Sequence, residues 1–209
     1  MSVSIVVADA GHVIYADAIC DLVLKSALER GTGIAKRSPE YIAGKIISGR
    51  AVIALEGADL AGFAYIETWS HSKYVANSGL IVAHKFRGQG LAKKIKSKVF
   101  NLSRKLYPDA KIFSITTGLA VMKLNTQLGF KPVTFSELTD DKEFWKGCEG
   151  CVNFDILKRN AYKMCLCTAL LYDPLEKGKS KITPALVSVG KHLIINPLVK
   201  INSIISLKK

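Results

Sequence analysis

The sequence predicts one domain of the α/β or α+β class, built around a mixed sheet and followed by a basic C-terminal extension. Through residues 1–175, short β-branched segments alternate with segments whose apolar residues recur at helical spacing. Residues 177–209 are different, because they carry seven lysines and no acidic residue. We therefore expect a domain over residues 1–175 and an extension over residues 176–209. The expected order is a strand, two helices, three strands, a helix, a strand, a helix and two strands.

The first elements are a strand and two helices. Residues 4–10 form a short β-branched run, which is typical of a strand. Residues 15–30 have apolar side chains at helical spacing, and Gly31 follows as a stop. Ser38 is a good N-cap for the second helix, and Pro39 suits its first position.

Three strands are expected next. Residues 51–57 and 60–69 are apolar and β-branched on either side of the turn Glu56–Asp59, which predicts a hairpin. Residues 78–82 read as the third strand, with two glycines shortly after it.

The helix after the glycines is amphipathic. Its apolar face is expected to hold Leu91, Ile95, Val99, Leu102 and Leu106. Its basic residues fall mostly outside that face, and they are Lys93, Lys94, Lys96, Lys98, Arg104 and Lys105.

The remaining elements complete the sheet. Residues 110–117 predict a buried strand, and residues 119–128 predict a helix that Gly129 ends. The last strands are expected at residues 131–135 and 163–172.

Composition and charge narrow the function classes. No apolar run reaches the roughly 18–20 residues that cross a bilayer, and the N-terminus does not resemble a signal peptide, so a cytoplasmic location is expected. The net charge of +13 is concentrated in the C-terminal extension, where aromatic residues do not alternate with the lysines. We therefore expect no nucleic acid as the main partner. The extension is either an amphipathic segment at a membrane surface or one that packs against the domain or a second subunit in a homodimer.

Gly88 and Gly90 lie between a strand and a helix, where backbone N–H groups can approach an anion and the helix dipole favours negative charge. The dinucleotide fingerprint is absent, because Lys93 stands where a third glycine or alanine belongs. The P-loop pattern is absent as well. A plain strand-to-helix connection is the alternative.

The segment from Arg87 to Ala92 reads Arg-x-x-Gly-x-Ala and resembles the acyl-CoA loop of the GNAT acyltransferase family. Residues 120–130, "AVMKLNTQLGF", resemble the next helix of that family, and the likeness covers about residues 3–173. It implies a mixed, mostly antiparallel sheet flanked by helices, and acetyl-CoA or another acyl-CoA as cofactor. By this likeness the cofactor contacts fall on Val82, Ala83, Arg87, Gly88, Gly90, Leu91 and Ala92.

One position departs from the family. Asn125 stands where the family often has a tyrosine that acts as a general acid. An amide cannot protonate a leaving thiolate, although Asn125 can still donate a hydrogen bond near the sulfur. A non-catalytic module that binds acyl-CoA therefore remains an alternative to an enzyme.

Two stretches resemble the acetyltransferase domains of bacterial N-acetylglutamate synthases: residues 31–46, and residues 111–141 with their Thr-Thr pair. The likeness implies a small-molecule amine as acceptor, an amino acid and glutamate first, as in arginine biosynthesis. Arg37 could then bind a carboxylate bidentately. Thr116 and Thr117 could offer hydroxyl groups. Two departures are Gly118, where an arginine often follows the threonines, and Ala76, where an acidic residue is expected.

Transfer of an acyl group to an amine requires a base that takes a proton. Glu67 at a strand end is the candidate, and His71 is the alternative. Asn77 and Ser78, leading into the strand before the glycines, could orient a water or the acceptor. The other acceptors considered are a protein lysine and a polyamine, for which an acidic pocket is expected.

Four of the five cysteines lie close together, as Cys148-x-x-Cys151 and Cys165-x-Cys167. Four thiolates at such spacing can hold a structural zinc ion, with the second pair on one face of a strand. The alternatives are free thiols and a lid formed by the segment that carries the first pair.

Overall fold

The computed structural model describes residues 2–31 and 34–178. The alternatives for the C-terminal extension concern residues that lie almost entirely outside this part of the chain. The chain divides into two compact units, Met1–Pro174 and Leu175–Lys209, and the first of them contains the whole sheet.

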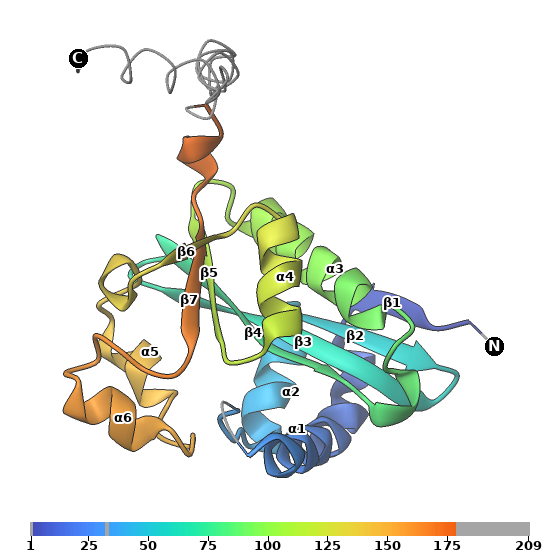
Figure 1. Ribbon diagram of the computed structural model, residues 1–209. Helices are drawn as coiled ribbons and strands as arrows, with labels where there is room; N and C mark the ends of the chain where they lie inside the picture. The colour runs from blue at the N-terminus through green and yellow to red at the C-terminus, as the bar shows by residue number, and fades with distance from the viewer. Residues whose placement is uncertain (1, 32–33, 179–209) are drawn as a thin grey trace, which may run out of the picture. The chain divides into compact units, whose positions relative to one another are not determined.

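The first unit is a seven-stranded sheet in the order β1-β2-β3-β4-β5-β7-β6 (Figure 1). Neighbouring strands are antiparallel except for β4 and β5, which are parallel. The predicted mixed, mostly antiparallel sheet is confirmed. The strands are β1 (Ser4–Val7), β2 (Ala51–Glu56), β3 (Asp59–Trp69), β4 (Tyr74–Val82), β5 (Lys111–Thr116), β6 (Lys131–Val133) and β7 (Thr168–Tyr172).

Helices cover both faces of the sheet (Figure 1). The pair α1 and α2 packs on one face, and α3 with α4 packs on the other. The α-helices are α1 (Ala16–Arg30), α2 (Pro39–Ile47), α3 (Leu91–Leu106), α4 (Leu119–Gln127), α5 (Lys142–Lys146) and α6 (Phe154–Arg159). The 3-10 turns are η1 (Ala10–Tyr15), η2 (His84–Phe86), η3 (Phe135–Glu137) and η4 (Pro174–Gly178).

Three apolar clusters hold these layers together, and each buries side chains that the sequence spaces on one face of an element. Ile95 and Val99 of α3 pack with Ile66 and Ile112 on one side of the sheet. The cluster under α1 and α2 is formed by Ile19, Ile42, Ile53, Phe63 and others. The third cluster joins the sheet to α5 and α6 through Phe113, Phe144, Trp145 and Leu157.

The helix boundaries follow the predicted signals. The side chain of Ser38 accepts a hydrogen bond from the N–H of Tyr41 at 3.3 Å, and Pro39 begins α2. Gly31 ends α1 with a φ of +66°, in the left-handed region that favours glycine. Gly129 follows α4 with a φ of +91°.

Two strands differ from the prediction. β4 begins at Tyr74 rather than Ser78, because β3 is 11 residues long and its last residues pair with residues 74–77. Asn77 and Ser78 therefore lie inside β4 and do not lead into it. β7 begins only at Thr168, so the two cysteines of the second pair precede the strand. The prediction that they share a strand face is wrong.

The segment between β6 and β7 contains two helices that the sequence pattern did not predict. α5 has five residues and α6 has six, which is too short for a helical periodicity to emerge. The side chain of Asp141 accepts a hydrogen bond from the N–H of Glu143 at 3.0 Å and caps α5.

The sheet opens between β4 and β5. Their pairing ends at Ala76 opposite Phe113. On its other edge, β4 contains a bulge, because Phe63 pairs with Ile81 while Tyr65 pairs with Ser78. The bulge places Gly79 at a φ of +65°. The divergence and the bulge position the candidate site.

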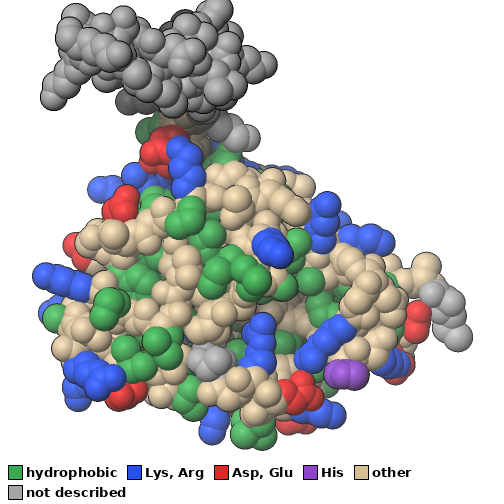
Figure 2. Space-filling view, in the orientation of Figure 1, with side chains coloured by type: hydrophobic (Ala, Val, Ile, Leu, Met, Phe, Trp, Pro, Cys, Tyr) green, Lys and Arg blue, Asp and Glu red, His purple; other side chains and the backbone are tan. Residues whose placement is uncertain are grey.

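The surface carries scattered charge. Figure 2 shows lysine and arginine side chains at several separate positions on the visible face, with apolar side chains between them. Among the described residues, no helix is both long enough and apolar enough to span a membrane.

Candidate active site

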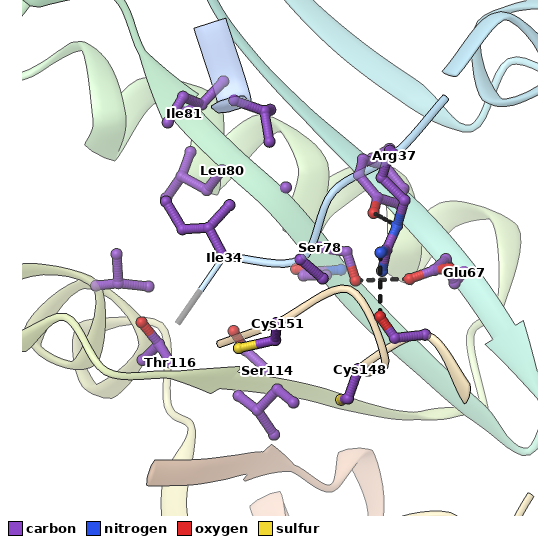
Figure 3. Close-up of a pocket in the computed structure, with 18 of the residues that line it drawn as sticks. Ile34, Arg37, Glu67, Ser78, Leu80, Ile81, Ser114, Thr116, Cys148 and Cys151 are labelled. Atoms are coloured by element: carbon purple, nitrogen blue, oxygen red, sulfur yellow. Dashed lines mark hydrogen bonds between the residues drawn. The ribbon is translucent and has the colours of Figure 1, made fainter. Parts of the chain in front are cut away.

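A cavity of about 180 Å³ lies where β4 and β5 diverge. Its walls come from the end of α1, the segment before α2, strands β3, β4 and β5, and residues 147–151 (Figure 3). Arg37, Glu67 and Ser78 lie close together on one side of it. Thr116 and Cys151 lie on other walls.

Glu67 is the buried acid of this cavity, with only 6% of its surface exposed. Ser78 Oγ donates to Glu67 Oε2 at 2.8 Å, and the hydroxyl of Tyr41 donates to Glu67 Oε1. Burial, and then the negative charge of Glu67, raise the pKa of Tyr41 above its ordinary value. Tyr41 therefore remains a donor, and Glu67 is the group that can accept a proton.

Arg37 is held by three oxygen atoms. Its Nε donates to the hydroxyl of Tyr65 at 3.1 Å, and its Nη1 donates to the carbonyls of Gly147 at 3.1 Å and Lys36 at 2.9 Å. Burial opposes its charge, but Tyr65 and Glu67 outweigh that effect and raise the pKa of Arg37. The Arg37 side chain is therefore a fixed cation in the cavity wall.

Arg30 is a second guanidinium at the cavity, and the sequence did not predict it. Its Nη2 lies 2.9 Å from the position that a Cβ on Gly118 would occupy. The absence of a side chain at Gly118 therefore leaves room for Arg30. Arg30 is the last residue of α1. At this position the sequence indicated the end of a helix and gave no sign that the side chain lines a cavity.

The glycine loop leads into α3. Gly88 and Gly90 have φ values of +79° and +73°, and a Cβ added to either would meet no atom within 4 Å. Gly90 is the N-cap of α3, and no side chain caps this helix. The N–H groups of its first turn, which include those of Leu91 and Ala92, are therefore open to an anion.

Solved structures share this architecture at low sequence identity. The N-acetylglutamate synthase of Neisseria gonorrhoeae, complexed with coenzyme A and N-acetyl-glutamate, is 18% identical, with a TM-score of 0.59. The match covers 83% of this chain but only 35% of that one. The GNAT superfamily phosphinothricin acetyltransferase of Sinorhizobium meliloti, in complex with acetyl-CoA, is 14% identical, with a TM-score of 0.55. That match covers 83% of this chain and 89% of the other. The fold is that of the GNAT acetyltransferases.

A third solved structure with this fold holds an amino acid. The diaminobutyrate acetyltransferase of Paenibacillus lautus, in complex with its substrate L-2,4-diaminobutyric acid and coenzyme A, is 13% identical, with a TM-score of 0.55. The match covers 83% of this chain and 95% of that one. No protein-family model and no curated protein matches the sequence, so the likeness to the GNAT proteins is one of fold.

Two of the residues predicted to contact the cofactor, Ala83 and Arg87, have hydrogen-bond partners within the protein. Arg87 turns back, and its guanidinium donates to the carbonyl of Val82 at 3.2 Å and to Glu29 at 3.4 Å. Ala83 already pairs through both backbone groups, since its N–H donates to Ala61 and its carbonyl accepts from Phe86. Arg87 therefore stabilises the loop through contacts within the protein. The N–H groups that are open to an anion lie after it, at the start of α3.

Other predicted residues are distributed as follows. Thr116 lines the cavity, and its Oγ1 accepts from the N–H of Gly118 at 3.0 Å. Asn77 lines it as well, whereas Thr117 does not. His71 lies exposed in the turn after β3 and lines a different hollow with Asp109. The structure thus does not bring His71 to Glu67, because β3 ends beyond Glu67 and the chain turns away.

Asn125 is fully buried in α4, and neither polar atom of its side chain has a hydrogen-bond partner. That the GNAT family often has a tyrosine at this position stays a prediction from the sequence. Polar side chains without a partner are rare in a folded interior, so Asn125 is an unusual residue of this domain.

Three of the four clustered cysteines, Cys148, Cys151 and Cys167, line the cavity. Burial raises the pKa of Cys148 to about 11 and that of Cys167 to about 12. Within the described ranges, no group of three or more Cys, His, Asp or Glu side chains is arranged to hold a metal ion. Zinc binding by these cysteines and Cys165 stays a prediction from the sequence.

Proposed function

We propose that this protein is an acetyl-CoA-dependent N-acetyltransferase whose acceptor is the amine of an amino acid, and glutamate first. One observation carries the proposal. A buried carboxylate, Glu67, and two guanidinium groups, Arg30 and Arg37, line a single cavity at the strand divergence of a GNAT fold. A carboxylate can accept a proton from an amine, and guanidinium groups can bind carboxylates.

The donor site is the loop before α3. The open N–H groups of Gly88, Gly90, Leu91 and Ala92 suit a pyrophosphate, and the dipole of α3 favours its charge. Lys93, Lys94 and Lys98 line a hollow beside Gly90 and suit further phosphate. Acetyl-CoA supplies an activated thioester. The loop and the lysines bind the phosphate end of acetyl-CoA. The acyl end is then free to lie between the diverging strands β4 and β5.

The acceptor site is the cavity. Two cations at the cavity suit an amino acid with two carboxylates better than a polyamine or a lysine side chain, which would meet like charge. Glu67 accepts the proton of the acceptor amine, either directly or through Ser78 Oγ, which lies 2.8 Å from its Oε2. Tyr41 holds the other carboxylate oxygen.

The named ligands of two neighbours support this class of acceptor. The N-acetylglutamate synthase structure holds N-acetyl-glutamate, and the diaminobutyrate acetyltransferase structure holds L-2,4-diaminobutyric acid. This chain spans only 35% of the first protein, so a place in arginine biosynthesis belongs to the proposal.

The test is a thiol-release assay. Acetyl-CoA and succinyl-CoA are each offered with a panel of acceptors: glutamate, aspartate, glutamine, diaminobutyrate, spermidine and a lysine peptide. We expect the highest kcat/KM with acetyl-CoA and glutamate. Faster transfer to spermidine or the peptide would establish the alternative acceptors. Tight coenzyme A binding without transfer to any acceptor would establish a non-catalytic module.

A further inference from the structure

Lys96 is a lysine in the interior of the domain. It is 2% exposed and lies on the buried face of α3 with Ile95, Val99 and Ser103. A buried ammonium is costly unless a carboxylate compensates it. No described carboxylate forms an ion pair with Lys96. Its burial therefore needs another explanation.

The groups that face Lys96 are nearly all uncharged. From β4, Asn77 Oδ1 accepts a hydrogen bond from Lys96 Nζ at 3.2 Å. The ring of Phe130 lies beneath the amine, 5.0 Å from Nζ to the ring centroid. Lys96 also lines a small hollow beside α4, together with Leu124, Gln127 and Leu128. Among the described residues, the charged group that lines this hollow besides Lys96 is the exposed Lys93. Burial alone lowers the pKa of Lys96 to about 7.

Asn77 is fixed in its orientation. Ser103 Oγ donates to the carbonyl of Val99 at 2.9 Å, so it accepts from Asn77 Nδ2 at 2.7 Å. The amide oxygen of Asn77 is then left for Lys96. Asn77 is also the first residue of β4 beyond its pairing with β5, and it lines the acceptor cavity. The network therefore holds the amine of Lys96 just behind the point where the strands diverge.

Asn125 is a second observation. Its side chain is fully buried, and neither of its polar atoms has a hydrogen-bond partner within the protein. It follows Leu124 in α4, and Leu124 lines the hollow that Lys96 also lines, whereas Asn125 does not line it. At this position α4 therefore carries an amide, which does not titrate, and the amine is carried by α3.

We propose that Lys96 is the general acid that protonates the departing thiolate, with Asn77 as the residue that positions it. This inference rests on the proposed acetyltransferase function. The acceptor amine forms a C–N bond to the acetyl carbon, and the C–S bond breaks with its electron pair left on sulfur. The sulfur takes a proton from Lys96 Nζ, while Glu67 takes the proton that the acceptor amine loses. Lys96 and Glu67 return to their starting states by proton exchange with water.

The physical chemistry suits this role. An amine whose pKa lies near 7 is about half protonated at neutral pH, so it can both donate a proton and recover one. Asn125, which stands at the expected tyrosine position, cannot do this. The acid is thus carried by α3 and not by α4.

The test is Lys96→Met, which keeps an unbranched side chain only one atom shorter and removes the titrating group. We expect kcat to fall about 100-fold or more, while KM for acetyl-CoA changes less than about twofold. In the wild-type protein kcat falls as pH rises above about 7, because the ammonium is lost. This falling limb should be absent in the variant, and the rising limb should remain. Lys105→Met, on the exposed side of the same helix, is the matched control.

Asn77→Asp is a second variant with a different readout. A carboxylate beside the amine raises its pKa, so the falling limb should move to higher pH by about one unit or more. A residue with a merely structural role would not move this limb.

The outcomes separate the two proposals. Wild-type kcat and pH profile in Lys96→Met would overturn the acid assignment and leave the acetyltransferase function intact. An unmoved falling limb in a folded Asn77→Asp would overturn it as well. A wild-type protein that binds coenzyme A but acetylates no acceptor would overturn the proposed function, and the acid assignment with it.

Discussion

Under the proposed function, Arg30 is a single residue that decides which acceptor fits the cavity. Its guanidinium lies beside Gly118, whereas the guanidinium of Arg37 is held by Gly147 and Tyr65. With two such cations, an acceptor can be fixed at both ends. Arg30 is exposed and Arg37 is partly buried, so the first can be changed with little effect on folding.

We predict that Arg30→Met raises KM for glutamate about 10-fold to 100-fold, as expected for loss of a charged hydrogen-bonding partner. KM for glutamine should change less, because its side chain carries no charge. Steady-state kinetics with both acceptors measure the difference. Arg159→Met, on the exposed face of α6, is the control and should match the wild type. Equal KM values for glutamate in wild type and Arg30→Met would exclude Arg30 as an acceptor contact.

Glu67 is the second residue whose role a variant can isolate. Glu67→Gln keeps the shape of the side chain and removes its ability to take a proton. We expect kcat to fall about 100-fold to 10,000-fold, while circular dichroism stays that of the wild type. Glu143→Gln, an exposed change on α5, serves as the control. A kcat within twofold of wild type would assign the base to another group.

The role of a single residue could be predicted where its partners are close to it in the sequence. Ser38, Pro39 and Gly31 act through neighbours in sequence, so their roles were readable. Lys96 was expected outside the apolar face of its helix, but it borders Ile95 and the face is wide enough to include it. His71 was placed near Glu67 by proximity in sequence, and the turn after β3 separates them.

At the scale of elements, the bulge in β4 depends on one glycine. A Cβ on Gly79 would lie 2.3 Å from the ring of Tyr65, and the φ of +65° is already unfavourable for other residues. Tyr65 in turn accepts a hydrogen bond from Arg37. A change in the bulge at Gly79 would therefore move the ring of Tyr65, and with it the guanidinium of Arg37.

We predict that Gly79→Ala lowers the free energy of unfolding by about 2 kcal/mol or more, and it should also lower activity because Tyr65 must move. The matched control is Gly57→Ala, since Gly57 has a φ of +60° but open space around its Cα. This control should lose only about 1 kcal/mol, from the backbone alone. Urea denaturation of both variants measures the difference. Equal losses would show that Tyr65 tolerates the added methyl group.

The elements themselves were largely predictable, because apolar periodicity follows from burial on one face. The hairpin of β2 and β3, the long helix α3 and the strand β5 are examples. The two short helices α5 and α6 were not, since five or six residues carry too little pattern. The cavity was also out of reach, because it depends on where β4 and β5 stop pairing.

At the scale of the whole molecule, Lys96 makes stability depend on pH. Its pKa is about 7 in the folded protein and near 10.4 when unfolded. Between these values the unfolded chain binds the additional proton, so the free energy of unfolding rises with pH. Below pH 7 both states are protonated, and this gain is lost.

We predict that the free energy of unfolding of the wild type rises by several kcal/mol between pH 7 and pH 10, apart from the contributions of other groups. Lys96→Met should remove this rise, and at pH 7 it should be more stable than the wild type. Lys105→Met should keep the rise. Chemical denaturation at a series of pH values tests this without any assay of activity. Parallel curves for wild type and Lys96→Met would show that the amine is not buried as described.

The proposed donor and acceptor sites meet where β4 and β5 diverge, but they are built from different segments of the chain. The proposed donor loop lies after β4, at residues 87–92, while Arg30, Arg37 and Glu67 come from segments before it. Under the proposed function, a substitution of Arg30 or Arg37 can alter which amine is accepted, while Glu67 and the phosphate loop stay unchanged. Such a scaffold can acquire a new acceptor while it retains its donor, and the two choices can be selected one at a time.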